Sequence, residues 1–391
     1  MQKQGRFSLK ERKILLWYAT GFVVVLFLFI LLSVIREGLP VPGAKSGHVE
    51  LAVLVPLSGS QSEQGHTALQ SVQQAAKNVP PGLKLNELEV TVVGYDTQST
   101  PEGAASAAWS AARNPSTVAI VGPFDARQLV AAAEVLKGKD IAIISPASTA
   151  PTLPLKQYPG VYCIPADDNA QGRAIADFLQ RGLNRTNVYL IAESTTYAEA
   201  IKETFTQTLQ SRVHVVDTLQ LGQGAWPSDL AQNITRSEAD VIVFLGGSKN
   251  ARSLLEALKT ADLKLPIVGS DSLNDPALLP LPENSPILYY TSPIVSLTAM
   301  PEDATFSIFK QALGNHTKSP FAYETTQAVW LVLGALSRPS SSDVERDVVW
   351  HKLASISLTS GPRFSRSIYV YQVDPNGQDW SLNNLIYIHQ D

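Results

Sequence analysis

Residues 118–144 read VAIVGPFDARQLVAAAEVLKGKDIAII, and this stretch decides the fold class. Two short apolar runs, Val118–Val121 and Ile141–Ile144, flank a segment from about Asp125 to Leu136 that has helical periodicity. Strands that are apolar throughout are buried on both faces, which is typical of a parallel sheet covered by helices. The stretch therefore predicts a strand–helix–strand unit.

The same alternation continues on both sides of this unit. Further apolar runs that predict strands lie at 51–55, 90–93, 188–191, 213–216, 241–244 and 266–268. Near the C-terminus, 368–373 and 385–388 predict two strands that flank a turn at 374–377. Two successive series of this kind predict an α/β fold with two doubly wound parallel-sheet lobes. We assign residues 49–165 plus about 293–366 to the first lobe, and 166–292 plus about 367–391 to the second. Because ligands bind beyond the carboxyl ends of such strands, we expect a cleft that closes by hinge motion.

The N-terminus predicts a membrane anchor. Ile14–Ile35 is an uncharged, mostly apolar run, long enough as a helix to cross the roughly 30 Å hydrocarbon core. Residues 1–13 carry five basic residues and one acidic residue, which predicts a cytoplasmic N-terminus. We interpret 14–35 as a transmembrane signal-anchor, 36–48 as a linker, and the body as periplasmic or extracellular. A cleaved signal peptide is the alternative.

Charge and composition exclude several functions. Beyond residue 13 the chain has 26 basic and 34 acidic residues, a balance that argues against nucleic acid as a partner. The six histidines show no metal-ligand spacing, and no phosphate-binding glycine loop or Gly-x-Ser-x-Gly elbow is present. The single cysteine, Cys163, lies in an apolar run and is interpreted as a buried core residue. We expect no enzyme, no cofactor and no metal.

Several segments follow predicted strands and carry a resemblance. They read VPLSG at 55–59, YDTQSTP at 95–101, VGP at 121–123 and ISPASTAP at 144–151, with weaker agreement at 164–172 and 268–271. In this order they resemble the type I periplasmic binding proteins, specifically the branched-chain amino-acid (Leu/Ile/Val) group of ABC-transporter substrate-binding proteins. The resemblance covers residues 49–391 and implies a non-catalytic binding protein.

The resemblance implies that the first lobe holds the carboxylate of an amino acid. The matching positions are Asp125 and Ala126, at a helix start, and Ala147, Ser148 and Thr149, just past a strand end. A helix start offers N–H groups to an anion. Asp125 is alternatively a helix cap, and Thr149 is alternatively only a turn residue.

The resemblance also implies that the second lobe holds the ammonium group. Asp271 matches the family's acidic position, Tyr197 opens a predicted helix, and Ser248 follows Gly246-Gly247 where relatives often carry a tyrosine. Asp271 is alternatively a cap of the next turn, and Tyr197 alternatively a core residue of its helix. Ala126 lacks the hydroxyl that the family carries at this position, and Ser248 stands where relatives often carry a tyrosine. The ligand could therefore also be an amide, a short peptide or a polyamine-like cation.

We expect from these features a protein that captures a small polar solute outside the membrane for an ABC permease. One alternative is a docking scaffold on the same fold, as in activators of peptidoglycan synthases. Another is a sensor that signals through a partner protein, because about 13 cytoplasmic residues leave no room for an output domain.

Overall fold

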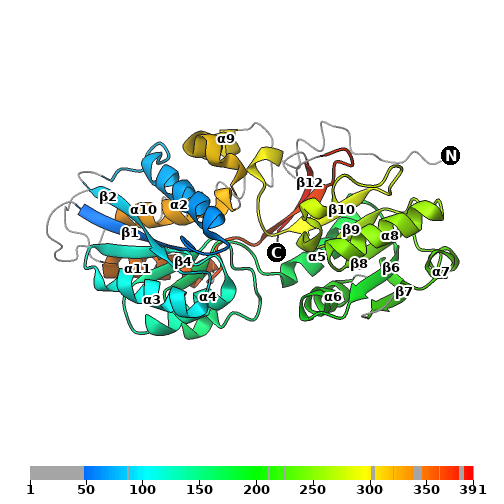
Figure 1. Cartoon of the computed structure of the whole chain (residues 1–391), viewed down its shortest axis with the longest axis horizontal. Coiled ribbons are helices and arrows are strands. Elements are labelled where there is room, and N and C mark those ends of the chain that lie inside the picture. The colour runs from blue at the N-terminus through cyan, green and yellow to red at the C-terminus, as the bar shows by residue number, and fades with distance from the viewer. Residues whose placement is uncertain are drawn as a thin grey trace. The chain divides into compact units, whose positions relative to one another are not determined.

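The computed structural model of the chain describes residues 48–85, 88–209, 212–222, 226–300, 304–319, 321–337, 346–360, 362–377 and 383–390 (Figure 1). The chain divides into two compact units. Of the described residues, those within 48–148, 152–164 and 304–364 form unit 1, and those within 149–151, 165–300 and 365–390 form unit 2. The division places 293–300 in unit 2, whereas the sequence analysis assigns residues from about 293 to the first lobe.

Unit 1 contains a five-stranded sheet in the order β2-β1-β3-β4-β5, with every neighbouring pair parallel. Its elements are β1 (His48–Val55), α2 (Ser62–Lys77), β2 (Glu89–Asp96), α3 (Pro101–Arg113), β3 (Thr117–Val121), α4 (Ala126–Val135), β4 (Ala142–Ser145), η1 (Leu155–Gln157), β5 (Val161–Cys163), α9 (Ala304–Leu313), η6 (Gly314–Lys318), α10 (Ala322–Leu336) and α11 (Arg346–Ser360).

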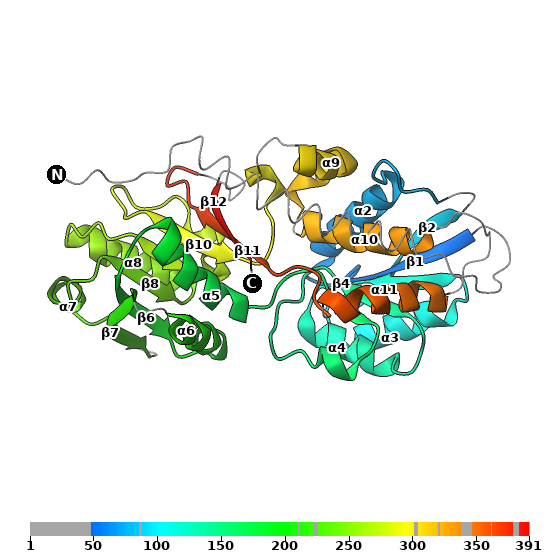
Figure 2. The same cartoon turned by 180° about the vertical axis from the view of Figure 1, so that it is seen from behind.

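Unit 1 is built around apolar central strands. All residues of β3 and β4, and all of β1 except its first, are buried. Helices α3 and α4 pack against each other on one side of the sheet, and α2 packs against α10 on the other, as both views show (Figures 1 and 2). The predicted strand–helix–strand unit is present, since 117–121, 126–135 and 142–145 form β3, α4 and β4.

Unit 2 contains a seven-stranded sheet in the order β12-β11-β10-β9-β8-β6-β7. Its elements are α5 (Asn169–Asp177), η2 (Phe178–Gly182), β6 (Asn187–Glu193), α6 (Thr196–Thr208), β7 (His214–Leu221), α7 (Leu230–Arg236), β8 (Val241–Leu245), α8 (Ser248–Thr260), β9 (Ile267–Gly269), η3 (Asp271–Leu273), η4 (Pro276–Leu278), β10 (Leu288–Ser292), η5 (Leu297–Ala299), β11 (Ser367–Gln372) and β12 (Asn384–Gln390).

The sheet of unit 2 is mixed, and this corrects the expectation of a parallel one. Strands β6 to β10 pair in parallel, but β10 with β11 and β11 with β12 pair antiparallel. For β11 and β12 the physical reason is the connection after Val373, where the Gly377 N–H donates to the Asp374 carbonyl (3.1 Å) in a tight turn. A tight turn reverses the chain, whereas a parallel pair needs a longer crossover. The sequence pattern did not predict a strand at 288–292, where β10 lies.

The last strand is attached to helix α5 by a partly buried carboxylate. Asp177 accepts hydrogen bonds from Tyr387 Oη (2.5 Å) and from His389 Nδ1 (3.0 Å). Arg181 Nε lies 2.9 Å from its other oxygen. Burial acts to raise the pKa of Asp177, but these hydrogen bonds and positive charges outweigh burial and lower it. The ionised carboxylate thereby fixes β12 to the rest of unit 2.

The N-terminal predictions fall outside the described residues. This applies to the membrane anchor Ile14–Ile35, the cytoplasmic segment 1–13 and the linker except for its last residue, His48. Within the described residues, no helix is both long enough and apolar enough to cross a membrane.

Candidate binding site

In unit 1, Asp125 is a helix cap. Its Oδ1 accepts the N–H groups of Arg127 (3.0 Å) and Gln128 (3.1 Å) in the first turn of α4. Two of the amides expected to bind an anion are therefore already bonded, and a carboxylate already stands at the positive end of this helix. Ala126 is the first residue of α4, half-buried, and its methyl group adds no hydrogen bond.

Glycine is required where β3 leads into this turn. Gly122 has φ +94°, a conformation that side chains disfavour, and its N–H donates to the Ile144 carbonyl (2.8 Å). A Cβ at this position would lie 2.5 Å from the Leu54 carbonyl oxygen. The backbone of the VGP segment is thus fixed by close packing against the neighbouring strands.

The segment after β4 carries hydrogen-bond donors that are not used internally. The Ser145 hydroxyl donates to the Pro123 carbonyl (2.6 Å), lies 2.8 Å from the Ser148 hydroxyl and accepts the Ser148 N–H (3.2 Å). Ser148 is therefore buried and already bonded. Thr149, which belongs to unit 2, accepts at its carbonyl from Asp168 N–H (3.0 Å). Among the described residues, the N–H groups of Ala147 and Thr149 and the Thr149 hydroxyl have no hydrogen-bond partner.

In unit 2, Asp271 and Tyr197 lie together. Asp271 begins the η3 turn after β9, and Tyr197 lies in the first turn of α6. The Tyr197 hydroxyl donates to Asp271 Oδ1 in a short hydrogen bond. The backbone N–H of Ser272 also stabilises the Asp271 carboxylate, and the Asn274 N–H donates to the Asp271 backbone carbonyl (2.8 Å), which closes the η3 turn.

Sequence reasoning missed a third member of this cluster, Gln171. It lies in α5, its side chain is fully buried, and its Nε2 donates to Asp271 Oδ1 (3.1 Å). The only signal in the sequence was its place within the family-like segment 164–172, which gives it no role. A contact between residues 100 positions apart is visible only in the folded chain.

The protonation of this cluster follows from its burial. Burial raises the pKa of Asp271, and the hydrogen bonds from Tyr197 and Gln171 act in the opposite direction without cancelling it. Burial, together with the charge and hydrogen bond of Asp271, raises the pKa of Tyr197, so the phenol stays a donor. A carboxylate held in such a place is stabilised by a cationic group brought next to it.

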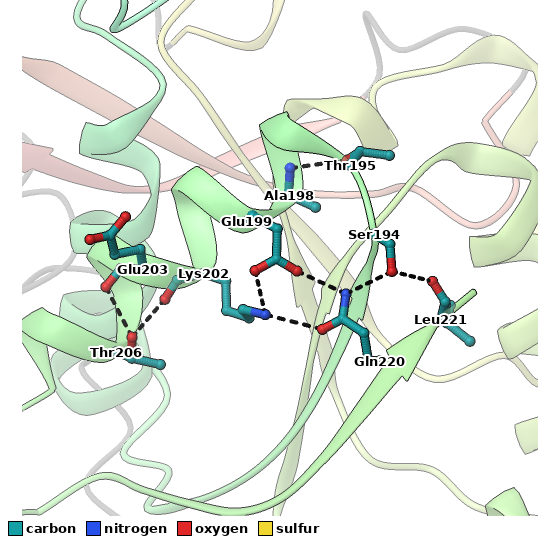
Figure 3. Close-up of polar contacts among 9 residues, drawn as sticks. All are labelled: Ser194, Thr195, Ala198, Glu199, Lys202, Glu203, Thr206, Gln220 and Leu221. Atoms are coloured by element: carbon teal, nitrogen blue, oxygen red, sulfur yellow. Dashed lines mark hydrogen bonds and ion pairs between the residues drawn. The ribbon is translucent and has the colours of Figure 1, made fainter. Parts of the chain in front are cut away.

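A network of polar contacts lies at the start of α6, the helix that carries Tyr197 (Figure 3). The Thr195 hydroxyl caps the helix by accepting the Ala198 N–H (3.1 Å). The Gln220 amide donates to Glu199 Oε1 (2.8 Å) and accepts from Lys202 Nζ (3.0 Å). These contacts join the first turns of α6 to β7, so the helix that carries Tyr197 is held against the sheet.

Ser248 and the preceding Gly247 donate hydrogen bonds to neighbouring carboxylates. The Ser248 hydroxyl donates to Asp275 in a short hydrogen bond, and the Gly247 N–H donates to Glu193 Oε1 (2.9 Å). A Cβ on Gly246 would lie 2.7 Å from Glu193 Oε1, whereas a Cβ on Gly247 would meet that atom only at 4.0 Å. A side chain at 246 would therefore require the Glu193 carboxylate to move from its hydrogen bond with Gly247.

The other polar candidates have structural roles. Asp96 accepts the N–H groups of Leu57 (2.8 Å) and Gln98 (2.9 Å) and the Ser58 hydroxyl (2.6 Å), and so holds the loop after β1. Cys163 is fully buried, and burial raises the pKa of its thiol to about 11. Among the described residues, no three His, Cys, Asp or Glu side chains are grouped to hold a metal ion.

Comparison with known proteins gives consistent matches. The sequence profile of the family described as "Periplasmic binding protein" matches residues 48–377. The chain is 23% identical over 228 residues to an amino acid binding protein of Pseudomonas aeruginosa, covering 58% of the chain and 61% of the relative. It is 21% identical over 235 residues to the Leu/Ile/Val-binding protein of Escherichia coli K12, covering 59% and 63%. The match thus spans less than two thirds of either relative.

Solved structures show the same fold. The branched-chain amino acid transporter substrate-binding protein of Streptococcus pneumoniae, in complex with isoleucine, superposes with a TM-score of 0.62 at 17% identity. The superposition covers 88% of this chain and 99% of that one.

Proposed function

Because the chain belongs to the periplasmic binding protein family, we propose that it captures an amino acid or a related zwitterion outside the cytoplasm for an ABC transporter. The relatives support the ligand class, since two of them are named for binding amino acids, one of these for Leu, Ile and Val. The family is one of binding proteins, and no catalytic step is part of this proposal.

One observation carries the proposal: the half-buried Asp271 carboxylate has hydroxyl and amide donors beside it but no cation. Tyr197 and Gln171 both donate to Asp271 Oδ1, and no lysine or arginine among the described residues pairs with it. An ionised carboxylate in such a place lacks a counter-ion, and a ligand ammonium group supplies one. Asp271 is therefore proposed to bind the ammonium group of the ligand.

The donors after β4 support the other half of the proposal. The N–H groups of Ala147 and Thr149 and the Thr149 hydroxyl have hydrogen-bonding capacity that the described residues do not use. A carboxylate that accepts two or three such donors is well stabilised. We therefore assign the ligand carboxylate to Ala147 and Thr149 and not to Asp125 or Ser148, whose side chains are bonded internally.

Membrane attachment and a permease partner complete the proposal. The apolar run Ile14–Ile35, with basic residues before it, supports a single-pass tether with the N-terminus in the cytoplasm. A tether would keep the loaded protein close to its permease. Protease protection of a C-terminal tag in intact spheroplasts tests this topology, because a body outside the membrane is digested without lysis.

Calorimetry with L-leucine and 4-methylpentanoate, which is leucine without its amino group, tests the ligand class. We expect saturable binding of leucine, at least about tenfold weaker binding of 4-methylpentanoate, and loss of leucine binding in Asp271→Asn. Glu50→Gln is the matched control, since it alters a buried carboxylate of unit 1 that accepts from Tyr95 (2.8 Å) and Thr117 (2.7 Å). Leucine binding that survives Asp271→Asn but not Glu50→Gln contradicts the assignment.

The internal bonding of Ser148, Ser248 and Asp125 favours one alternative, a protein-docking scaffold without a small ligand. The same calorimetry decides, extended to a panel of the twenty common amino acids, their amides and spermidine. No heat with any member, from protein whose thermal unfolding is cooperative, refutes solute capture and leaves the scaffold.

A further inference from the structure

The amide of Gln171 is bonded at both of its ends. Its Oε1 accepts the backbone N–H of Asp271 (3.0 Å) and the hydroxyl of Thr291 (2.9 Å). Its Nε2 lies within hydrogen-bonding distance of Asp271 Oδ1 (3.1 Å), Tyr197 Oη (3.2 Å) and Asp168 Oδ1 (3.4 Å). Two donors face one end and three acceptors the other, so the amide has a single favourable orientation.

This arrangement holds Asp271 at two points. Gln171 accepts from the backbone of Asp271 and donates to its carboxylate, so main chain and side chain are fixed by one planar group. Gln171 and Thr291 are both fully buried, and water does not compete for these bonds. A carboxylate fixed in this way presents its other oxygen, Oδ2, in a constant direction.

We propose that Gln171 is the positioning residue of the ammonium site, which orients Asp271 and keeps it ionised for the ligand. This inference rests on the proposed function, since it assumes that Asp271 binds an ammonium group. The residue touches Asp271 and not the ligand in this assignment, and acts through the carboxylate alone.

The groups around Asp271 decide whether removal of the Gln171 donor raises or lowers the pKa of Asp271. Tyr197 on α6 and Tyr290 on β10 face Asp271, and Asp168 at the start of α5 faces Tyr197 and the Gln171 amide. Arg252 on α8 donates to the Leu278 carbonyl (2.6 Å). None of them is a cation paired with Asp271. Without the Gln171 donor, the neutral form of Asp271 gains, its pKa rises further, and fewer molecules carry the charge that an ammonium group needs.

A titration without ligand tests the inference directly. The ¹³C NMR signal of the Asp271 carboxyl, identified by its loss in Asp271→Asn, is followed with pH in the wild type, Gln171→Leu and Thr291→Val. We expect the midpoint at a higher pH in Gln171→Leu, with Thr291→Val between it and the wild type, because Thr291 only orients the amide. Gln171→Asn, which keeps an amide but shortens it, is expected to match Gln171→Leu. A midpoint unchanged in both Gln171 variants overturns the inference.

Binding of L-leucine and 4-methylpentanoate gives the second readout. We expect Gln171→Leu to weaken the binding of leucine about 10- to 100-fold and the binding of 4-methylpentanoate less than about threefold, because only leucine carries the ammonium group. Equal weakening of both compounds indicates a merely structural role and overturns the inference. If the wild type does not bind leucine, the proposed ligand fails, and the ligand-free titration still decides the role of Gln171.

Discussion

Replacing Asp271 with Asn is expected to stabilise the ligand-free protein at neutral pH while it destroys the ammonium site. Asn has the shape of Asp and still accepts from Tyr197 and Gln171 at its oxygen, but it carries no charge. Wild-type protein must keep a desolvated carboxylate, and burial raises the pKa of that group. Function and stability therefore oppose each other at this residue.

The sign and size of the effect follow from linkage. A carboxyl whose pKa is higher in the folded than in the unfolded protein loses stability as pH rises from about 4, the unfolded value, through the folded value. Each pKa unit of difference amounts to about 1.4 kcal/mol. We expect the free energy of unfolding of Asp271→Asn to be higher than that of the wild type at pH 7.5. Near pH 3.5 most of this difference should vanish.

Urea unfolding at pH 3.5, 5.5 and 7.5, followed by tryptophan fluorescence without ligand, measures this difference. Glu50→Gln is the control, because its carboxylate accepts three side-chain donors, including Asn114 (2.7 Å), and its loss should destabilise the protein. The reasoning is refuted if the difference in free energy of unfolding between Asp271→Asn and the wild type does not grow with pH. It is also refuted if Asp271→Asn is less stable than the wild type at pH 7.5.

Three further predictions concern the surroundings of the site. Gly246→Ala should lower the free energy of unfolding by about 1–3 kcal/mol, because its Cβ would lie 2.7 Å from Glu193 Oε1. Gly247→Ala should change the free energy of unfolding by less than about 1 kcal/mol, because its Cβ would meet that atom only at 4.0 Å. Thermal unfolding compares the two variants, and equal effects contradict the packing argument. Asp177 has a lowered pKa, so its contribution is full above pH 4 and lost as pH falls through the folded value. Acid unfolding of Asp177→Asn should therefore lack this part of the wild-type pH dependence, and a parallel curve would count against it. Asp125→Ala should cost about 1 kcal/mol in urea unfolding by loss of the α4 cap, and no change would mean that the cap is not needed.

The strand and helix pattern was readable because burial on both faces leaves a strong signal. The runs at 118–121 and 141–144 predict β3 and β4, and β1 follows from the same rule, whereas the residues of β2 are only half-buried or exposed. The last two strands, with a turn between them, were predicted. The antiparallel pairing of β11 with β10 was not, because the composition of a strand does not give its direction. Its direction depends on the connection that precedes it and on its neighbour β10.

The candidate site divides in the same way. The resemblance to the binding-protein family identified Asp271, Tyr197 and Thr149 as candidates, and a position after a strand end agreed with this for Asp271 and Thr149. The position of a residue in the sequence does not show whether its side chain is available to a ligand or is already hydrogen-bonded within the protein. Asp125 and Ser148 are chemically suited to a ligand, yet both are used by their own neighbours.

The sequence by itself determined the α/β class, the order of the elements and the family, because hydrophobic period and strand-end motifs are local properties of the chain. Only the tertiary structure decided which polar side chains remain for a ligand. Gln171, Tyr197, Asp271 and Thr291 are far apart in sequence, and their hydrogen bonds form only when β9, β10, α5 and α6 come together. Burial, which sets the charge of Asp271, likewise exists only in the folded chain.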